Sequence, residues 1–400
     1  MNNETDSNKD AKAIAARHVA PHPAAVATTT TAGGRLIDWV PIESQVPGGQ
    51  VATPPPAPED SGSRQATAPS PGELGAVAFE LQDPNAERGP EGTVPILRDL
   101  AVHARRVARR GADKKGIDRR GAGQDAGAAD PNPFGYYHAT SGQSGTFYGC
   151  QSYLAVYDPS VENGSDHSIN QFGLQNYDNP QPQSLEAGWT VDQGLNGDAN
   201  PHIFTYYTTN GYTKDGDNLG GYNETVQGWI QYDATAHPGA AINGVSVIGG
   251  PQLGVSMKFR LWQGNWWFQV QGVWLGYYPA SLFGTAALAD HAGWAGFWGE
   301  VYSALADPTQ TTTQMGSGEF AEAGWPNACF QHGIQVQTVS DGTMSDLNGS
   351  ASQEDSTYYD IAQTMQSGAD WGSYFFAGGP GNGVAPAFTR LVTEKAEAHV

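Results

Sequence analysis

Apolar and polar residues alternate along much of the chain after residue 133, and this pattern predicts short β-strands. In the stretch VSMKFRLWQ, one face carries Val255, Met257, Phe259 and Leu261, and the other face carries polar or amphipathic residues. The dipeptide GN at 264–265 separates this run from WWFQVQGVWLGYY. Two such runs around a glycine turn predict a β-hairpin.

Further short β runs are expected at 146–157, 202–208, 227–232 and 245–248, with glycine and proline between them. Within this region we expect one helix of note, PASLFGTAAL at 279–288. Strands at this spacing predict an all-β protein, an antiparallel β-sandwich such as a jelly roll.

Composition divides the chain into three parts. Residues 1–72 are poor in large apolar side chains and contain runs such as TTTTAGG and ATPPPAPEDSGS, so we expect them to be disordered. We interpret residues 73–132 as a pro-segment, which includes a candidate basic amphipathic helix, LRDLAVHARRVARRG, and several dibasic pairs. The basic stretch is either a solvated linker or a protease-sensitive junction. Residues 133–400 would form the β-sandwich domain.

The uneven charge excludes one class of partner. Residues 131–400 carry 24 acidic and 5 basic side chains, whereas residues 1–130 carry 17 and 15, and the net charge is −21. A surface this acidic repels nucleic acid. No apolar run has the length of a membrane span. The start, MNNETDSNKD, does not have the pattern of a signal peptide, so for a secreted protein either the leader has been left off or the start is misassigned.

Two cysteines, Cys150 and Cys329, leave two possibilities open. They are either two buried thiols or the partners of one long-range disulfide in an oxidising compartment.

Several common catalytic motifs are missing from the sequence. There is no G-x-S-x-G nucleophile elbow and no H-E-x-x-H zinc motif, and the histidines lack the spacing of metal ligands. The loop GGPGNG has no following Lys-Ser or Lys-Thr, so it does not form a phosphate-binding loop. We therefore expect chemistry without a metal or a cofactor.

Two carboxylates in aromatic and glycine-rich surroundings are the remaining candidates. In GWAGFWGEVYS, alternation puts Glu300 on the face opposite Phe297 and Val301, and in SLEAGWTV it separates Glu186 from the aliphatic face. Two carboxyl groups in a partly desolvated cleft share a proton, so one serves as base and the other as acid. This pair would hydrolyse amide or glycosidic bonds. A glutamate in a strand is also often structural, and a second EAGW block offers Glu322 as a rival.

Five longer blocks occur over most of 134–330, in the order SLEAGWTV, DANPHIFTYYTTNGYTKDGDNLGGYNETVQGWIQ, GNWWFQVQGVWLGYYPASLF, WGEV and TQMGSGEF. In these blocks the sequence resembles the neprosin family of secreted plant and microbial proteins. Upstream, PEGTVPILR resembles the end of the family's pro-domain. The resemblance implies a β-sandwich of the lectin–glucanase kind and a glutamic peptidase that cuts after proline. The family's two catalytic glutamates match Glu186 in LEAGW and Glu300 in FWGEV, and the block order argues against Glu322.

Three departures from the family pattern leave the dyad intact. Gly221 and Val226 stand where the family has two cysteines, Trp298 stands at a usual glycine, and YYT replaces YWT. The change beside Glu300 is expected to narrow the cleft and affect the preferred substrate.

Other residues are candidates for substrate contacts. Aromatic rings that could stack on proline are Trp189, Trp298 and Tyr302, and amides that could bind a carbonyl or an oxyanion are Gln252 and Gln314. Core packing or loop capping is an equal alternative for each.

We therefore predict the secreted zymogen of a glutamic endopeptidase. Its N-terminal pro-segment would shield the cleft, and its partners would be proline-containing peptides and its own pro-segment. It would act at acidic pH through Glu186 and Glu300. The rival hypotheses are a lectin-like carbohydrate-binding sandwich, a glycosidase with a carboxylate pair, and a family member that has lost activity.

Overall fold

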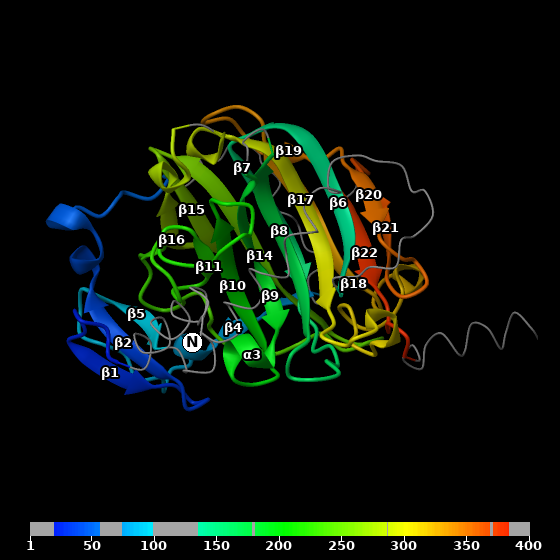
Figure 1. Ribbon diagram of the computed structural model, residues 1–400, viewed down its shortest axis with the longest axis horizontal. Coiled ribbons are helices and arrows are strands. Elements are labelled where there is room, and N and C mark those ends of the chain that lie inside the picture. The colour runs from blue at the N-terminus through cyan, green and yellow to red at the C-terminus, as the bar shows by residue number, and fades with distance from the viewer. Residues whose placement is uncertain are drawn as a thin grey trace, which may run out of the picture.

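The computed structural model describes residues 20–56, 74–98, 135–177, 181–285, 287–368 and 371–383. Two large sheets dominate this part of the chain, and Figure 1 shows their long strands side by side. The prediction of an all-β antiparallel sandwich is confirmed.

The first sheet carries both candidate glutamates. Its seven strands lie in the order β11 (Gly220–Tyr222), β10 (Pro201–Thr208), β9 (Gln183–Val191), β8 (His167–Asn176), β17 (Ala292–Tyr302), β6 (Tyr136–Phe147) and β20 (Ser350–Gln353). All its pairings are antiparallel.

The second sheet covers one face of the first. Its main path is β12 (Ile230–Gln231), β16 (Val273–Pro279), β15 (Asn265–Val270), β14 (Gln252–Trp262), β7 (Gly149–Ala155), β18 (Cys329–Gln337), β22 (Tyr374–Gly378) and β21 (Asp360–Thr364). Off this path, β19 (Ser345–Asp346) pairs with β18, and β3 (Leu74–Ala76) runs parallel to β14.

The remaining elements are short. A small sheet of β1 (Ala27–Thr30), β2 (Leu36–Pro41) and β5 (Thr93–Arg98) lies beside the sandwich at the lower left of Figure 1, and β4 (Ala78–Phe79) pairs with β13 (Ile242–Asn243). The helical turns are α3 (Gln193–Asn196), η1 (Ile42–Gln45), η2 (Pro47–Gly49), η3 (Glu80–Gln82), η5 (Ala280–Phe283), η6 (Ala287–Ala289), η7 (Pro308–Gln310) and η8 (Ala321–Ala323). Among the described residues, no helix has the length and apolar character needed to cross a bilayer.

The core lies between the two sheets and follows the predicted alternation. Val255, Met257 and Phe259 of β14 are buried in it, as are Leu185 and Phe297 of the first sheet. Burial of such side chains stabilises the fold by about 2 kcal/mol each. Because alternate residues of a strand point to opposite faces, the glutamates next to these core residues point to the outer face of the first sheet.

Local predictions along the chain were partly right. The hairpin of β14 and β15 is present, but its loop is Gln263-Gly264, one residue earlier than expected, with φ of 48° and 72°. Positive φ at both loop positions is the geometry that matches the twist of the strands. The helix expected at 279–288 is instead the two short turns η5 and η6, which Gly284, at φ 90°, interrupts. The run at 245–248 is not a strand.

Our prediction that residues 1–72 are disordered is wrong for residues 20–56. They contribute β1 and β2 to the small sheet, because Ile37 and Trp39 find apolar partners in Leu81 and Leu97 far along the chain. The rest of that region, the candidate basic helix and the dibasic pairs lie outside the described residues.

The possible disulfide between Cys150 and Cys329 is not formed, and both are buried free thiols. The pairing of β7 with β18 places Cys150 opposite Val336, seven residues along β18 from Cys329. That corresponds to a separation on the order of 20 Å at the rise of a strand. A disulfide requires Cα atoms within about 7 Å.

We predict that alkylation of the unreduced protein will label both cysteines after unfolding and neither before it. Burial keeps reagents out, and it raises the pKa of Cys329 to about 12 and that of Cys150 well above its ordinary value. The thiolate is the reactive form. Mass spectrometry after iodoacetamide treatment in denaturant without reductant should show two additions. If the unfolded, unreduced protein gains no label, the two cysteines form a disulfide and the prediction is wrong.

Candidate active site

Strand β8 fixes the relative positions of the two candidate glutamates. It lies between β9 and β17 (Figure 1), and its register places Glu186 opposite Gly173 and Glu300 opposite Ile169. Positions 169 and 173 are an even number of residues apart, so both glutamates point to the same face of the sheet. Each is 3% exposed.

Gln171 lies on the same face between these two positions. It is paired with Gly188 of β9 and Trp298 of β17, and its Nε2 donates to Glu300 Oε2 at 2.9 Å. Its Oε1 is buried and accepts no hydrogen bond among the described residues. Sequence reasoning missed Gln171, although its place in SINQFGLQN puts a polar side chain on the outer face of a strand.

Glu300 is surrounded by hydrogen-bond donors. His167 Nε2 lies 2.9 Å from Oε1, and the indole nitrogen of Trp298 donates to Oε2 at 3.4 Å. An indole N–H and an amide NH₂ can only donate. Such donors favour the ionised carboxylate.

A positive charge lies beside this carboxylate. His138 Nε2 is 3.4 Å from Glu300 Oε2, and its Nδ1 is 2.8 Å from Glu354 Oε1. Burial opposes the charge on His138, but Glu354 and Glu300 outweigh burial and raise the pKa of His138 to about 10. His138 is therefore a cation at neutral and acidic pH.

Glu186 has different neighbours. Its Oε1 accepts hydrogen bonds from Ser184 Oγ at 2.8 Å and from the Tyr212 hydroxyl at 2.5 Å. The Tyr212 ring is stacked on Tyr206, the residue of β10 opposite Glu186, with centroids 5.9 Å apart. Hydroxyl groups donate and accept, so these partners accommodate either a carboxylate or a carboxylic acid.

The indole of Trp298 bridges the region between the two glutamates. Its nitrogen contacts Glu300, and its far edge lies over Gly173. A Cβ atom at Gly173 would be 3.0 Å from Trp298 Cη2 and 3.2 Å from Glu186 Cγ. The absence of a side chain at residue 173 therefore allows Trp298 and Glu186 to approach each other above β8.

Our expectation that the two carboxylates share one proton is not supported. Their positions are four residues apart along β8, with one glutamate on each side of that strand. In a flat sheet this gives a Cα separation on the order of 16 Å. Each carboxylate is instead hydrogen-bonded to its own set of partners.

Two predicted aromatic contacts have opposite outcomes. Tyr302 lies on the outer face next to Glu300, with its ring centroid 5.5 Å from that of His167. Trp189 does not lie with the glutamates: it is fully buried in the core, and its indole donates to Ala155 O at 2.8 Å. The alternation that directs Glu186 outward directs Trp189 inward.

The side-chain amides of Gln252 and Gln314, which were predicted to bind substrate, are hydrogen-bonded to backbone atoms of loops. Gln252 Nε2 donates to carbonyls of Val247, Gly250 and Pro326, and Gln314 Oε1 accepts from Ser160 N at 2.9 Å. The structure therefore gives both amides a loop-capping role. The rival Glu322 is an exposed residue on η8.

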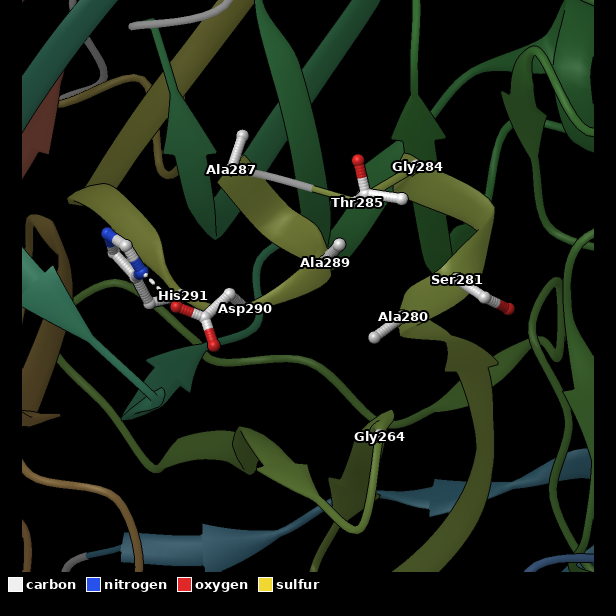
Figure 2. Close-up of a pocket in the computed structure, with 9 residues that line it drawn as sticks. All are labelled: Gly264, Ala280, Ser281, Gly284, Thr285, Ala287, Ala289, Asp290 and His291. Atoms are coloured by element: carbon white, nitrogen blue, oxygen red, sulfur yellow. Dashed lines mark hydrogen bonds and ion pairs between the residues drawn. The ribbon is translucent and has the colours of Figure 1, made fainter.

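A surface cavity of about 630 Å³ lies elsewhere, next to η5 and η6. Figure 2 shows Asp290 and His291 at one side of it, joined by a 2.9 Å ion pair, and the Ser281 hydroxyl directed away from them. Small side chains and backbone form most of its wall. Neither candidate glutamate lines it. Within the described ranges no group of three or more His, Cys, Asp or Glu residues could hold a metal ion.

Comparison with known proteins identifies the family. The Neprosin family model matches residues 164–380, which is more than half of the chain and includes both glutamates. Among solved structures, CG-16, a homodimeric agglutinin from chicken liver, is 8% identical, with a TM-score of 0.22 over 41% of this chain and 93% of that one. The β-porphyranase BpGH16B from the human gut bacterium Bacteroides plebeius is 10% identical, with a TM-score of 0.16 over 43% of this chain and 53% of that one. These structural likenesses are too low to support an inference, and it is the family match that assigns the chain to the Neprosin family.

Proposed function

We propose that this chain is the secreted zymogen of a glutamic endopeptidase that cleaves peptide bonds after proline at acidic pH. The observation that carries this proposal is the placement of Glu186 and Glu300 on one face of one sheet, with unequal hydrogen-bond partners. Family membership is consistent with a peptidase.

Glu300 is the better candidate for the base that activates water. A base must be ionised at the pH of the reaction, and in acid this requires donors that stabilise the carboxylate. Gln171, Trp298 and the His138 cation supply them. These contacts also fix the orientation of the carboxylate before a substrate arrives.

Glu186 is the better candidate for the acid. Its partners Ser184 and Tyr212 accommodate its protonated form, which can donate to a substrate carbonyl oxygen or to the leaving amine. A base and an acid on opposite sides of β8 suit a peptide bond that lies across this strand. Water would approach from the side of Glu300, and the amine would leave protonated.

Trp298 and Tyr302 are candidates for proline contacts. Both lie on the outer face of β17, on either side of Glu300. A flat ring stacks well on a pyrrolidine ring. Because Trp298 stands where the family usually has glycine, its indole is expected to narrow the cleft and restrict the side chains accepted there.

Zymogen behaviour is supported by the docking of the N-terminal part, residues 20–56 and 74–98, on the sandwich. Arg35 forms an ion pair with Glu80, and its Nη1 donates to Gly239 O at 2.6 Å. Glu80 Oε1 lies 3.6 Å from His237 Nε2, so a buried ion pair of the N-terminal part is in a polar cluster with His237 and Gly239 of the sandwich. We propose that acid weakens this cluster.

The dyad is tested by three substitutions. Glu186→Gln and Glu300→Gln should each lower kcat/KM on a proline-containing peptide at pH 3–5 by at least about 1000-fold, because each removes a group that transfers a proton. Glu322→Gln, in the exposed second EAGW block, is the matched control and should retain full activity. Cleavage that survives either dyad substitution would contradict the proposal.

A second prediction concerns the pH profile. His138→Gln removes the cation beside Glu300, so protonation of Glu300 becomes easier and the acid limb of the kcat/KM profile should move to higher pH. Activity on the acid limb should fall by roughly tenfold. Glu354→Gln should have a smaller effect, because His138 keeps its contact with Glu300. An unchanged acid limb in His138→Gln would exclude this role.

A third prediction concerns release of the N-terminal part. Burial lowers the pKa of His237 to about 4, Glu80 opposes this, and Arg35 and His202 reinforce it. His237 is thus neutral when docked, so docking weakens as pH falls from about 6.5 towards 4, by about 3 kcal/mol at most.

His237→Gln should therefore flatten the pH dependence of N-terminal processing, followed as a mass drop to about residue 130 onward. His291→Gln, at the distant cavity, serves as the control. Full activity of an unprocessed chain would remove the zymogen proposal.

The same assays separate the rival functions. A lectin-like module would bind glycans with both glutamates dispensable, and a glycosidase would cleave oligosaccharides and leave peptides intact. An inactive family member would do neither.

A further inference from the structure

Four aromatic rings form a cluster on the outer face of the second sheet, which we call the aromatic platform. They belong to Tyr232, Trp267, Trp274 and Tyr277. The centroid of Trp267 lies 4.6 Å from that of Tyr277, 5.4 Å from Tyr232 and 6.2 Å from Trp274. Their neighbours Trp266 and Tyr278 point into the core between the sheets, so the platform faces away from the first sheet and its glutamates.

Trp267 is the centre of the platform and is fully buried although it lies on an outer face. Its indole N–H has no hydrogen-bond acceptor among the described residues. A buried donor without an acceptor costs about 1–3 kcal/mol. An indole N–H is a donor only, so its natural partner is a carbonyl group. The platform therefore has one hydrogen-bonding position that the described residues do not fill.

The chain's own residues 51–56 lie at this platform. Ala52 N donates to the Tyr277 hydroxyl at 3.2 Å, and Figure 1 shows the segment leaving η2 and reaching β15 and β16. Pro55 is buried, although Thr53 and Pro56 are exposed. Val51, Ala52 and Pro54 are half-buried, so the segment lies against the protein surface along most of its length.

The sequence TPPP at 53–56 determines the backbone of this segment. Proline fixes φ near −65° and restricts the preceding residue to extended conformations. Consecutive prolines therefore adopt a polyproline II helix. Such a helix makes no internal hydrogen bonds, so its carbonyls remain available to a donor such as an indole N–H.

A second contact, made by Gln45, holds the chain in place before it reaches residues 51–56. Gln45 Oε1 accepts from Gln231 N at 2.9 Å, and Gln45 Nε2 donates to Gln231 O at 2.8 Å. Gln231 belongs to β12, the edge strand that precedes Tyr232. This paired contact to the backbone of an edge strand aligns the segment that leads to the platform.

We propose that the aromatic platform is a binding site for proline-rich peptide segments in the polyproline II conformation. Within the chain, residues 51–56 lie at its edge through the contact of Ala52 with Tyr277 and leave the Trp267 N–H unfilled, and a proline-rich stretch of a substrate takes their place and supplies the acceptor once they leave. Surfaces lined by aromatic rings are a recurrent means of binding this conformation. The proposal rests on the proposed peptidase function for the identity of the occupant. It places a substrate-holding site on the sheet opposite the catalytic one.

The test uses the full chain in a Glu300→Gln background, so that the probe is not cleaved. The triple substitution Pro54→Ser, Pro55→Ser and Pro56→Ser, called the serine variant, vacates the platform, and the probe is a synthetic peptide with the sequence GGQVATPPPAP. We expect the serine variant to bind this peptide at least tenfold more tightly than the parent, measured by calorimetry. A peptide with serines in place of its central prolines should not bind.

Two further variants identify the surface. Trp274→Ala, at a half-buried ring, should weaken peptide binding at least tenfold in the serine variant. Tyr374→Ala removes a half-buried ring of β22, four strands from β15 in the second sheet, and should leave binding unchanged. Tyr277→Phe keeps the ring, removes the hydroxyl that contacts Ala52, and should weaken binding severalfold.

Three results would overturn the proposal: equal binding by the parent chain, binding that Trp274→Ala does not affect, or displacement of the peptide by an oligosaccharide. Because binding is measured without catalysis, a failure of the platform proposal can be distinguished from a failure of the proposed peptidase function. Platform binding in a chain with no peptidase activity would contradict only the proposed function. Peptidase activity without peptide binding would contradict only the platform.

Discussion

The pairing of β8 with both β9 and β17 is the constraint on which the candidate site depends. Two glutamates separated by more than a hundred residues of sequence reach the same surface because both register with one strand, at positions of equal parity. A shift of one residue in either pairing would turn one carboxylate into the core and expose an apolar side chain in its place. The apolar core therefore determines the register of these strands, and the register determines where the two glutamates lie.

Within this arrangement the two carboxylates are distinguished by what they contact. Glu300 is held by groups that can only donate and by a histidine cation, whereas Glu186 contacts hydroxyl groups. Identical residue types thus have different hydrogen-bond partners, which is the basis of the proposed base and acid roles. The aromatic platform on the second sheet also depends on the alternation of side chains along its strands. There, aromatic side chains occupy outward positions that in many sandwiches are polar.

The sequence predicted the parts of this arrangement that local pattern determines. Alternation in SLEAGWTV and GFWGEVYS gave the outward direction of both glutamates, and the family resemblance selected them over Glu322. The contacts made by His138, His167, Gln171 and Tyr212 depend on strand pairing across long separations, which no local pattern records. Trp189 was a candidate for substrate contact with core packing as an equal alternative, and its alternation with Glu186 already favoured the core. Residues 20–56 were expected to be disordered because they are poor in large apolar residues, but Ile37 and Trp39 find apolar partners in Leu81 and Leu97, which local composition does not reveal.

The most direct test of the central claim is a crystal structure of the Glu300→Gln variant with a proline-containing peptide at acidic pH. We expect the peptide to cross β8, with its scissile carbonyl near Gln171 and between residues 186 and 300, and with its proline against Trp298 or Tyr302. A peptide bound on another surface, with the outer face of the first sheet unoccupied, would contradict the account.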